Sequence, residues 1–189
     1  MFEVIGANLY HMDLDVFYFF NLYSYNLILD LLMPLITIAG TQIFWIIICI
    51  GLYVFGAQKG KQTAFLCIIA LFIAFFASEI LKFILARPRP YEVLSGARHL
   101  MDVAGYSLPS GHTTTAFAAF TVIGIKYRYL YIFLGFAVLV AISRIYMGLH
   151  YPSDVLAGAL LGIFCSLIVL KYEGKLIRTK NKILNKNSQ

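Results

Sequence analysis

Three short polar clusters interrupt a chain of otherwise apolar segments, and each contains groups that can bind or transfer a phosphoryl group. They are Lys82 with Arg89-Pro90, the run Pro109-Ser110-Gly111-His112, and Ser143-Arg144 with His150 and Asp154. Together they supply three cations, two imidazoles, one carboxylate and a helix-start sequence. This inventory suits a site that holds a phosphate by positive charge and attacks its phosphorus with a nucleophile.

The third cluster contains a histidine and an aspartate four residues apart. Pro152 suits the first turn of a helix, and residues four apart can share a helix face. A carboxylate at Asp154 can hold one nitrogen of the His150 imidazole and leave the other free to act as nucleophile or base. Taken alone, the pair also fits an interfacial histidine beside a helix-capping aspartate.

The second cluster has the composition of a helix start that can bind an anion. Ser110 is a good N-cap and Gly111 allows close approach of the backbone. The free N–H groups and the dipole of a helix N-terminus attract negative charge, and His112 lies where it can exchange a proton near a bound anion. Alone, this run also fits an ordinary capped helix.

The cations Lys82, Arg89 and Arg144 are suited to phosphate oxygens, because Arg offers a planar fork and Lys a compact charge. Lys82 and the nearby Arg87 also have simpler interpretations. Glu79 lies three residues before Lys82, so an ion pair on one helix face also explains that lysine. Arg87 fits a side chain that extends to a membrane interface, and we do not assign it to the site.

The elements that must position these clusters have the composition of membrane helices. The chain of 189 residues is 61% hydrophobic and only 13% charged, whereas soluble domains carry about a quarter charged residues. Six segments approach the roughly 20 apolar residues that cross a bilayer. They are residues 23–40, 42–57, 63–85, 113–125, 129–147 and 155–172. We therefore predict an all-α fold, a six-transmembrane helix bundle formed by a single domain over residues 1–189.

The segments on either side of the predicted 23–172 core differ in charge. Residues 1–22 carry three acidic side chains and no Lys or Arg, which argues against a cleavable signal peptide. Their mixture of aromatic and acidic residues predicts a helix in the membrane interface, with a helix facing water as the alternative. Residues 173–189 are predicted to be a basic cytoplasmic tail.

The net charge of +6 is distributed in a way that predicts orientation. Ten of the fifteen cations fall on one side of a six-span arrangement, and the positive-inside rule makes that side cytoplasmic. The five others approach the opposite face: Lys82, Arg87, Arg89, Arg98 and Arg144. Topology thus explains the charge, and we expect no nucleic-acid partner. We expect a plasma-membrane protein with a cytoplasmic amino terminus and with the clusters on the extracytoplasmic side.

The linked pattern resembles the three-part signature of the type-2 phosphatidic acid phosphatase superfamily, which comprises membrane lipid phosphatases and shares its site with vanadium haloperoxidases. The matching motifs are Lys82-x6-Arg89-Pro90, Pro109-Ser110-Gly111-His112 and Ser143-Arg144-x5-His150-x3-Asp154. Every position of the three motifs matches, and the resemblance extends over about residues 20–172.

The resemblance implies a role for each motif residue. His150 would be the nucleophile that forms a phosphohistidine, Asp154 would orient it, and His112 would protonate the leaving lipid oxygen. The phosphoryl oxygens would be bound by the cations and the helix start, namely Lys82, Arg89, Ser110, the Gly111 amide and Arg144. Phosphoryl transfer is mainly positioning and stabilisation of negative charge, so we expect no metal and no cofactor.

The substrate class is a further implication of the resemblance. Small six-span microbial members often act on polyprenyl diphosphates such as undecaprenyl diphosphate, which is our first expectation. Phosphatidylglycerophosphate, phosphatidic acid and lipid A are the alternatives. The polar connection over residues 91–108 is either a lid or headgroup selector, or a simple cover over the helix ends.

Two functions of other classes compete with hydrolysis. An anion channel or transporter would line a path with cations, but it needs polar residues through the spans, whereas the clusters lie at one end. An inactive, lipid-binding member of the family is the other alternative, which the intact His150, His112 and Asp154 disfavour.

Overall fold

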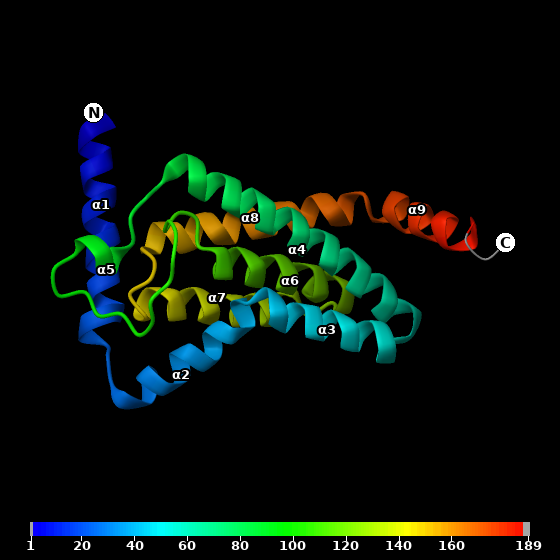
Figure 1. Ribbon diagram of the computed structural model, residues 1–189, viewed down its shortest axis with the longest axis horizontal. Coiled ribbons are helices and arrows are strands. Elements are labelled where there is room, and N and C mark those ends of the chain that lie inside the picture. The colour runs from blue at the N-terminus through cyan, green and yellow to red at the C-terminus, as the bar shows by residue number, and fades with distance from the viewer. Residues whose placement is uncertain (1, 187–189) are drawn as a thin grey trace.

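The computed structural model describes residues 2–186, and this part of the chain is helical without strands (Figure 1). The α-helices are α1 (Phe2–Tyr18), α2 (Leu27–Thr37), α3 (Gln42–Phe55), α4 (Ala57–Leu85), α5 (Pro90–Val93), α6 (Gly111–Tyr127), α7 (Leu130–Tyr146), α8 (Pro152–Lys171) and α9 (Glu173–Lys186). The predicted all-α class is confirmed. Residues 1 and 187–189, at the ends of the predicted segments, lie outside the described residues.

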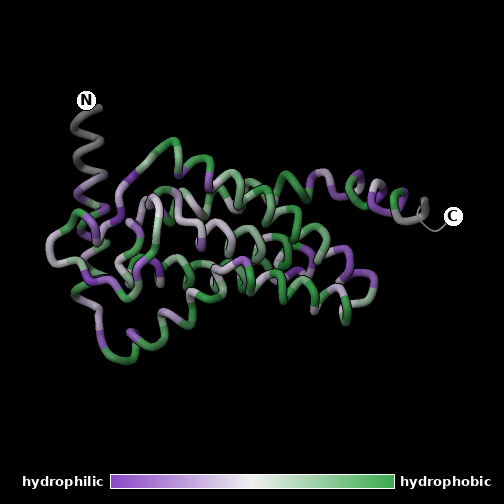
Figure 2. Tube along the Cα trace, viewed as in Figure 1, coloured by the Kyte–Doolittle hydropathy of each residue, from purple (hydrophilic) through white to green (hydrophobic). Residues whose placement is uncertain are grey.

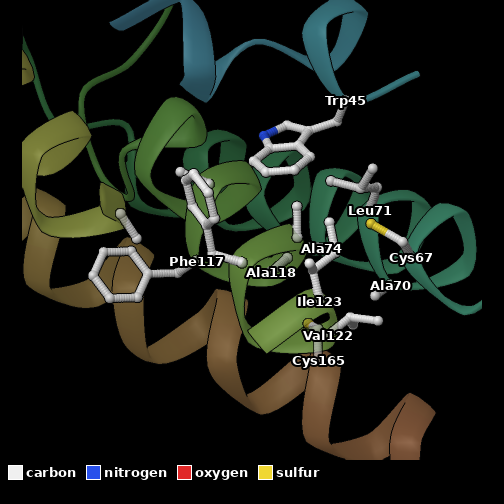
Figure 3. Close-up of a cluster of buried hydrophobic side chains, with 14 of the residues drawn as sticks. Trp45, Cys67, Ala70, Leu71, Ala74, Phe117, Ala118, Val122, Ile123 and Cys165 are labelled. Carbon is white, nitrogen blue, oxygen red and sulfur yellow. The ribbon is translucent and has the colours of Figure 1, made fainter. Parts of the chain in front are cut away.

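Helix α6 forms the centre of the bundle and packs against α4, α7 and α8. Its residues 113–124 are all buried, which is the pattern of a helix surrounded by other helices. Small side chains allow the close approach. Figure 3 shows Ala118 of α6 and Ala74 of α4 in one buried cluster, and a Cβ added at Gly162 of α8 would lie 2.9 Å from the Ala118 backbone nitrogen. At Gly158 of α8 an added Cβ would lie 2.7 Å from the Ser110 carbonyl oxygen, so the start of α6 is fixed closely against α8.

The predicted six-span count is not confirmed. Among the described residues, two helical stretches have the length and hydropathy of a span, Ala57–Val93 and Pro152–Lys171. The pair Tyr10–Tyr23 and Leu27–Gly40 would qualify only together, and it is bent by 118°. Helices α3 and α7 are apolar but shorter.

Helices α2 and α3 continue in the same direction along the long axis of the bundle (Figure 1). A short 3₁₀ turn, Ile38–Gly40, separates them, and Thr41 caps α3 by accepting a hydrogen bond from the Phe44 amide. The predicted spans 23–40 and 42–57 therefore run in the same direction, whereas two successive spans would be antiparallel. The hydropathy pattern correctly predicted an interruption near residue 41, but it carries no information on whether the chain reverses direction there.

Helix α1 lies across the bundle axis, at the end that holds the three clusters (Figure 1). Asp13 contacts Arg87 and Ser153, and the Asn21 side chain donates to the Tyr146 and Arg98 carbonyl oxygens at 2.9 Å. The expectation that the amino-terminal segment lies at the end opposite the clusters is therefore wrong. The error arises because residues 23–40 were predicted to run toward the clusters, whereas α2 starts at the end that holds them and runs away from it. Its position in a membrane interface stays a prediction.

The basic residues of the predicted cytoplasmic side gather at the other end of the bundle. Lys126 pairs with Glu173 at 2.5 Å, Lys59 lies over the Tyr127 ring, and Lys180 of α9 lies over the Tyr53 ring. Figure 2 shows hydrophilic residues along α9 and at the neighbouring helix ends, beyond a mostly hydrophobic bundle. The two groups of cations thus lie at opposite ends, as the charge distribution predicted, and the basic tail is a helix through Lys186.

Candidate active site

His150 lies in the connection between α7 and α8 and is almost fully buried, at 2% exposure. Its Nδ1 faces the Asp154 carboxylate, 3.7 Å from Oδ2, and the Ser107 hydroxyl at 3.5 Å. Its Nε2 faces Nη1 of Arg89 at 3.3 Å. The two ring nitrogens therefore have different surroundings, and the one turned away from the carboxylate points toward a cation.

Asp154 is fully buried in the first turn of α8, where hydrogen bonds fix its carboxylate. Oδ2 accepts from the Tyr151 backbone N–H at 2.8 Å and from the Ser107 hydroxyl, and Oδ1 pairs with Nη1 of Arg87 at 2.7 Å. The contact with Tyr151 is half of a capping box, so the helix start itself positions this carboxylate. Asp154 is thus a rigid anion that faces His150.

Arg89 follows the end of α4 and is buried at 2% exposure. Its guanidinium donates to three backbone carbonyl oxygens, those of Leu149 at 3.0 Å, Gly105 at 2.8 Å and Ala104 at 3.2 Å. These bonds join the connection before α8 to the loop before α6. A planar group with five donors can make such contacts and still face His150.

Gly111, His112 and Lys82 line a cavity of about 370 Å³ between α4, the start of α6 and the α2–α3 break. A Cβ added at Gly111 would lie 3.1 Å from Nζ of Lys82, so glycine lets the lysine approach the helix start. Lys82 also pairs with Glu79 at 2.6 Å. The helix-face ion pair weighed above as an alternative is therefore present, but the lysine lines the cavity as well.

Ser110 is buried and precedes the first residue of α6, but its hydroxyl does not cap the helix. The hydroxyl instead accepts a hydrogen bond from Thr113 Oγ1 at 2.9 Å, and its backbone N–H donates to the Asp154 carbonyl oxygen at 3.0 Å. The second and third clusters are therefore joined by a direct backbone bond. The Ser110 hydroxyl oxygen thus lies at the start of α6 but accepts no hydrogen bond from the backbone N–H groups of its first turn.

Arg144 is 1% exposed near the end of α7 and donates from Nη1 to the Thr37 hydroxyl at 3.0 Å. Its buried Nε has no hydrogen-bond partner within the described part of the chain. A buried guanidinium N–H without a partner is costly, and an anion would satisfy it. His112, which lines the cavity, lies close enough to Arg144, His150, Lys82 and Arg89 for their charges to act on its imidazole.

Burial lowers the pKa of His150 to about 4, and the charges of Arg144 and Arg89 act in the same direction. Asp154 opposes this effect by stabilising the imidazolium. The imidazole is therefore neutral at physiological pH, which is the form that can act as a nucleophile or base.

Two residues at the site were missed in the sequence. Ser107, which bonds to Asp154, stands outside every motif and gave no signal. Arg87, which we predicted to extend to the membrane interface, contacts Asp154 instead. Its position on the less basic side of the membrane could have indicated a role at the site.

His99 forms a second histidine–aspartate pair at this end, with Nε2 3.3 Å from Asp102 Oδ1, but the pair is exposed and separate from the cavity. In the described residues, three or more His, Cys, Asp or Glu side chains nowhere come together in a group that could hold a metal ion.

A buried imidazole between a carboxylate and an arginine, near a cavity lined by Lys82 and His112 at one end of an apolar bundle, has the features of a membrane phosphatase. The chain belongs to the PAP2 superfamily, whose family model matches residues 63–178. It is similar to an undecaprenyl-diphosphatase of Sulfolobus acidocaldarius, at 32% identity over 82% of this chain and 76% of the relative.

Two solved structures share the fold. The crystal structure of Aquifex aeolicus LpxE matches with a TM-score of 0.75 and 32% identity, over 84% of this chain and 94% of that one. A PAP2-type phosphatidylglycerolphosphate phosphatase of Bacillus subtilis matches with a TM-score of 0.74 and 25% identity, over 89% and 87%. The chain is therefore a membrane protein of a phosphatase superfamily.

Proposed function

We propose that this protein is a membrane lipid phosphatase that hydrolyses a lipid phosphate or diphosphate through a phosphohistidine at His150, with polyprenyl diphosphate as the preferred substrate. The observation that carries the proposal is the arrangement around His150, where Nδ1 faces Asp154 and Nε2 faces Arg89. The nitrogen turned away from Asp154 thus lies beside the cation that would hold the phosphoryl group.

In the proposed first step, Nε2 of His150 bonds to phosphorus while the bond from phosphorus to the leaving oxygen breaks. His112 donates a proton to that oxygen, which leaves as the lipid alcohol or, from a diphosphate, as the lipid monophosphate. Asp154 stabilises the positive charge that develops on the imidazole. In the second step His112 accepts a proton from water, the water oxygen bonds to phosphorus, and the P–N bond breaks to release phosphate.

The phosphoryl oxygens are assigned to the cations and the helix start of the three clusters, namely Lys82, Arg89, Ser110, the Gly111 amide and Arg144. Of these, Lys82 and Gly111 line the cavity. Nε of Arg144, which has no hydrogen-bond partner among the described residues, supports this assignment, because a bound phosphate would supply an acceptor. These groups stabilise a phosphoryl transition state by charge alone. We propose that the reaction needs no metal and no cofactor.

The preference for a polyprenyl chain is supported by the apolar seam between α3 and α4. The site cavity shares Gln42 and Phe75 with a neighbouring cavity of about 140 Å³. That cavity shares Ile46 and Ile68 with one of about 290 Å³, which reaches Tyr53 at the opposite end of the bundle. A single row of apolar cavities suits one long chain better than the paired chains of phosphatidylglycerophosphate or phosphatidic acid.

The activity is tested with purified protein in detergent, by measuring phosphate release from undecaprenyl diphosphate, phosphatidylglycerophosphate and phosphatidic acid in the presence of a chelator. We expect turnover with the chelator present, fastest on undecaprenyl diphosphate. His150→Ala should abolish it, whereas His99→Ala, at an exposed histidine of the same end, should not. Turnover that requires added divalent metal would contradict the metal-free mechanism, and faster turnover of a two-chain lipid would contradict the substrate preference.

We further propose that the site faces the extracytoplasmic side of the plasma membrane, because the basic residues gather at the other end of the bundle. The protein would be a single domain over residues 1–189. The three native cysteines are buried, so new cysteines can report the orientation. In intact cells an impermeant thiol reagent should label Ser95→Cys and not Asn181→Cys. The reverse pattern would overturn the proposed orientation.

A further inference from the structure

The amino-terminal helix reaches the candidate active site through one ion-pair network. Nη2 of Arg87 lies 2.7 Å from Oδ2 of Asp13, and Nη1 lies 2.7 Å from Oδ1 of Asp154. One guanidinium therefore bridges a carboxylate of α1 and the carboxylate that faces His150. Asp13 is 7% exposed and Asp154 is fully buried, so these pairs are shielded from water, unlike weak pairs on a protein surface.

Ser153 joins the same network next to Asp154. Its backbone N–H donates to Oδ1 of Asp13 at 2.7 Å, and its hydroxyl donates to Oδ2 of Asp13 at 2.5 Å. The hydroxyl also accepts from Nη1 of Arg87 at 2.6 Å. Asp13 therefore accepts from the free Ser153 amide in the first turn of α8 and also pairs with Arg87. Both of these partners adjoin Asp154: Ser153 precedes it in the chain, and Arg87 pairs with its carboxylate.

The guanidinium plane of Arg87 is also fixed by stacking. Its central carbon lies 3.8 Å from the centroid of the Tyr151 ring. With one face on the ring and its donors shared between two carboxylates, the group has one favourable orientation. That orientation leaves Oδ2 of Asp154 turned toward His150, since Oδ1 is held by the arginine.

We propose that Asp13 is a positioning residue for phosphoryl transfer, acting through Arg87 on Asp154 and so on His150. Helix α1 is then part of the active site, although it lies outside the residues 63–178 that match the family model. Loss of the Asp13 carboxylate would free one side of a guanidinium that is 22% exposed. Asp154 would then lose the fixed partner of its Oδ1, although Tyr151 and Ser107 still hold Oδ2. The inference rests on the proposed roles of His150 and Asp154.

The test is Asp13→Asn, which removes the charge and keeps the side-chain shape. We expect kcat for undecaprenyl diphosphate to fall about tenfold, as is common for residues that orient a reacting group from behind, with KM at the wild-type value because Asp13 does not line the cavity. Asp15→Asn is the matched control, since Asp15 is exposed on the same helix, and it should leave both constants unchanged.

A double-mutant cycle with Arg87→Gln identifies the route. If Asp13 acts through Arg87, Asp13→Asn has no further effect on kcat in the Arg87→Gln background. An equal loss in both backgrounds, or wild-type kcat in Asp13→Asn, overturns the inference. If Asp13→Asn does not fold, Arg87→Lys replaces it: the lysine keeps the charge but lacks the fork, so a lower kcat supports the inference and an unchanged kcat overturns it.

Failure of this inference is separable from failure of the proposed function. Wild-type kcat in Asp13→Asn together with an inactive His150→Ala would remove only the role of Asp13. An active His150→Ala would remove the phosphohistidine mechanism itself.

Discussion

Asp154→Asn is the sharpest perturbation of the proposed chemistry, because it removes one charge and leaves the side-chain shape. The carboxylate of Asp154 accepts from Arg87 on one oxygen and from the Tyr151 amide and Ser107 hydroxyl on the other. An asparagine has one acceptor oxygen, so in either orientation its NH₂ group meets Arg87 or the Tyr151 N–H, donor against donor.

The expected size of the effect follows from the geometry. Oδ2 of Asp154 lies 3.7 Å from Nδ1 of His150, where a full charge pair at an effective dielectric constant of about 20 is worth about 4 kcal/mol. Arg87 shares the carboxylate and reduces this value. Since about 1.4 kcal/mol corresponds to a factor of ten in rate, we expect kcat to fall roughly 10²- to 10³-fold.

The assay is phosphate release from undecaprenyl diphosphate in detergent, with kcat and KM measured for each variant. Asp102→Asn is the control, because Asp102 also pairs with a histidine of this end, His99, but is 91% exposed. Its kcat should match the wild type. Wild-type kcat in a folded Asp154→Asn protein would refute the idea that the carboxylate stabilises a positively charged His150 during the reaction.

Three further predictions concern the same site. In the proposed mechanism the neutral imidazole of His150 reacts, and burial lowers its pKa to about 4. We therefore expect kcat/KM to hold its plateau down to about pH 5 and to fall as the pH drops through 4, whereas a fall centred near 6.5 would contradict the buried position. Gly111→Ala would place its Cβ 3.1 Å from the Lys82 ammonium, so the flexible end of the lysine must move. We expect KM to rise about tenfold while thermal stability is unchanged, and an unchanged KM would argue against Lys82 as a substrate contact. Gly40→Ala would place its Cβ 2.7 Å from Cβ of His112. We expect thermal unfolding to show a free energy of unfolding lower by about 1–3 kcal/mol, together with a lower kcat, and wild-type values of both would contradict this packing.

The convergence of the clusters could be predicted because each depends on local rules. The spacing of His150 and Asp154 across a helix start brings imidazole and carboxylate together, and the structure shows them 3.7 Å apart. The segregation of basic residues to one end followed from charge bias alone. Both predictions tolerate errors of a few residues in the span boundaries, because they depend only on which end of the bundle each residue lies at.

The network around Asp154 could not be predicted, because its members meet only through tertiary structure. Asp13 contacts Ser153 across 140 positions of the chain, and Ser107 contacts Asp154 across 47. No periodicity or motif joins residues so far apart. Asp13 was visible only as an acidic residue in a segment assigned to the interface, and the reversed first span placed that segment at the wrong end.

The break between α2 and α3 forms one border of the cavity. Helix α2 ends at Thr37 and α3 begins at Gln42, so the short turn between them brings Gly40 against His112 and lets Thr41 and Gln42 line the cavity. Thr37, the last residue before the turn, holds Arg144. A continuous straight helix over these residues would satisfy hydropathy better, yet it would lose the turn that borders the cavity. Departure from the regular pattern thus coincides with the site, as is expected where local regularity gives way to function.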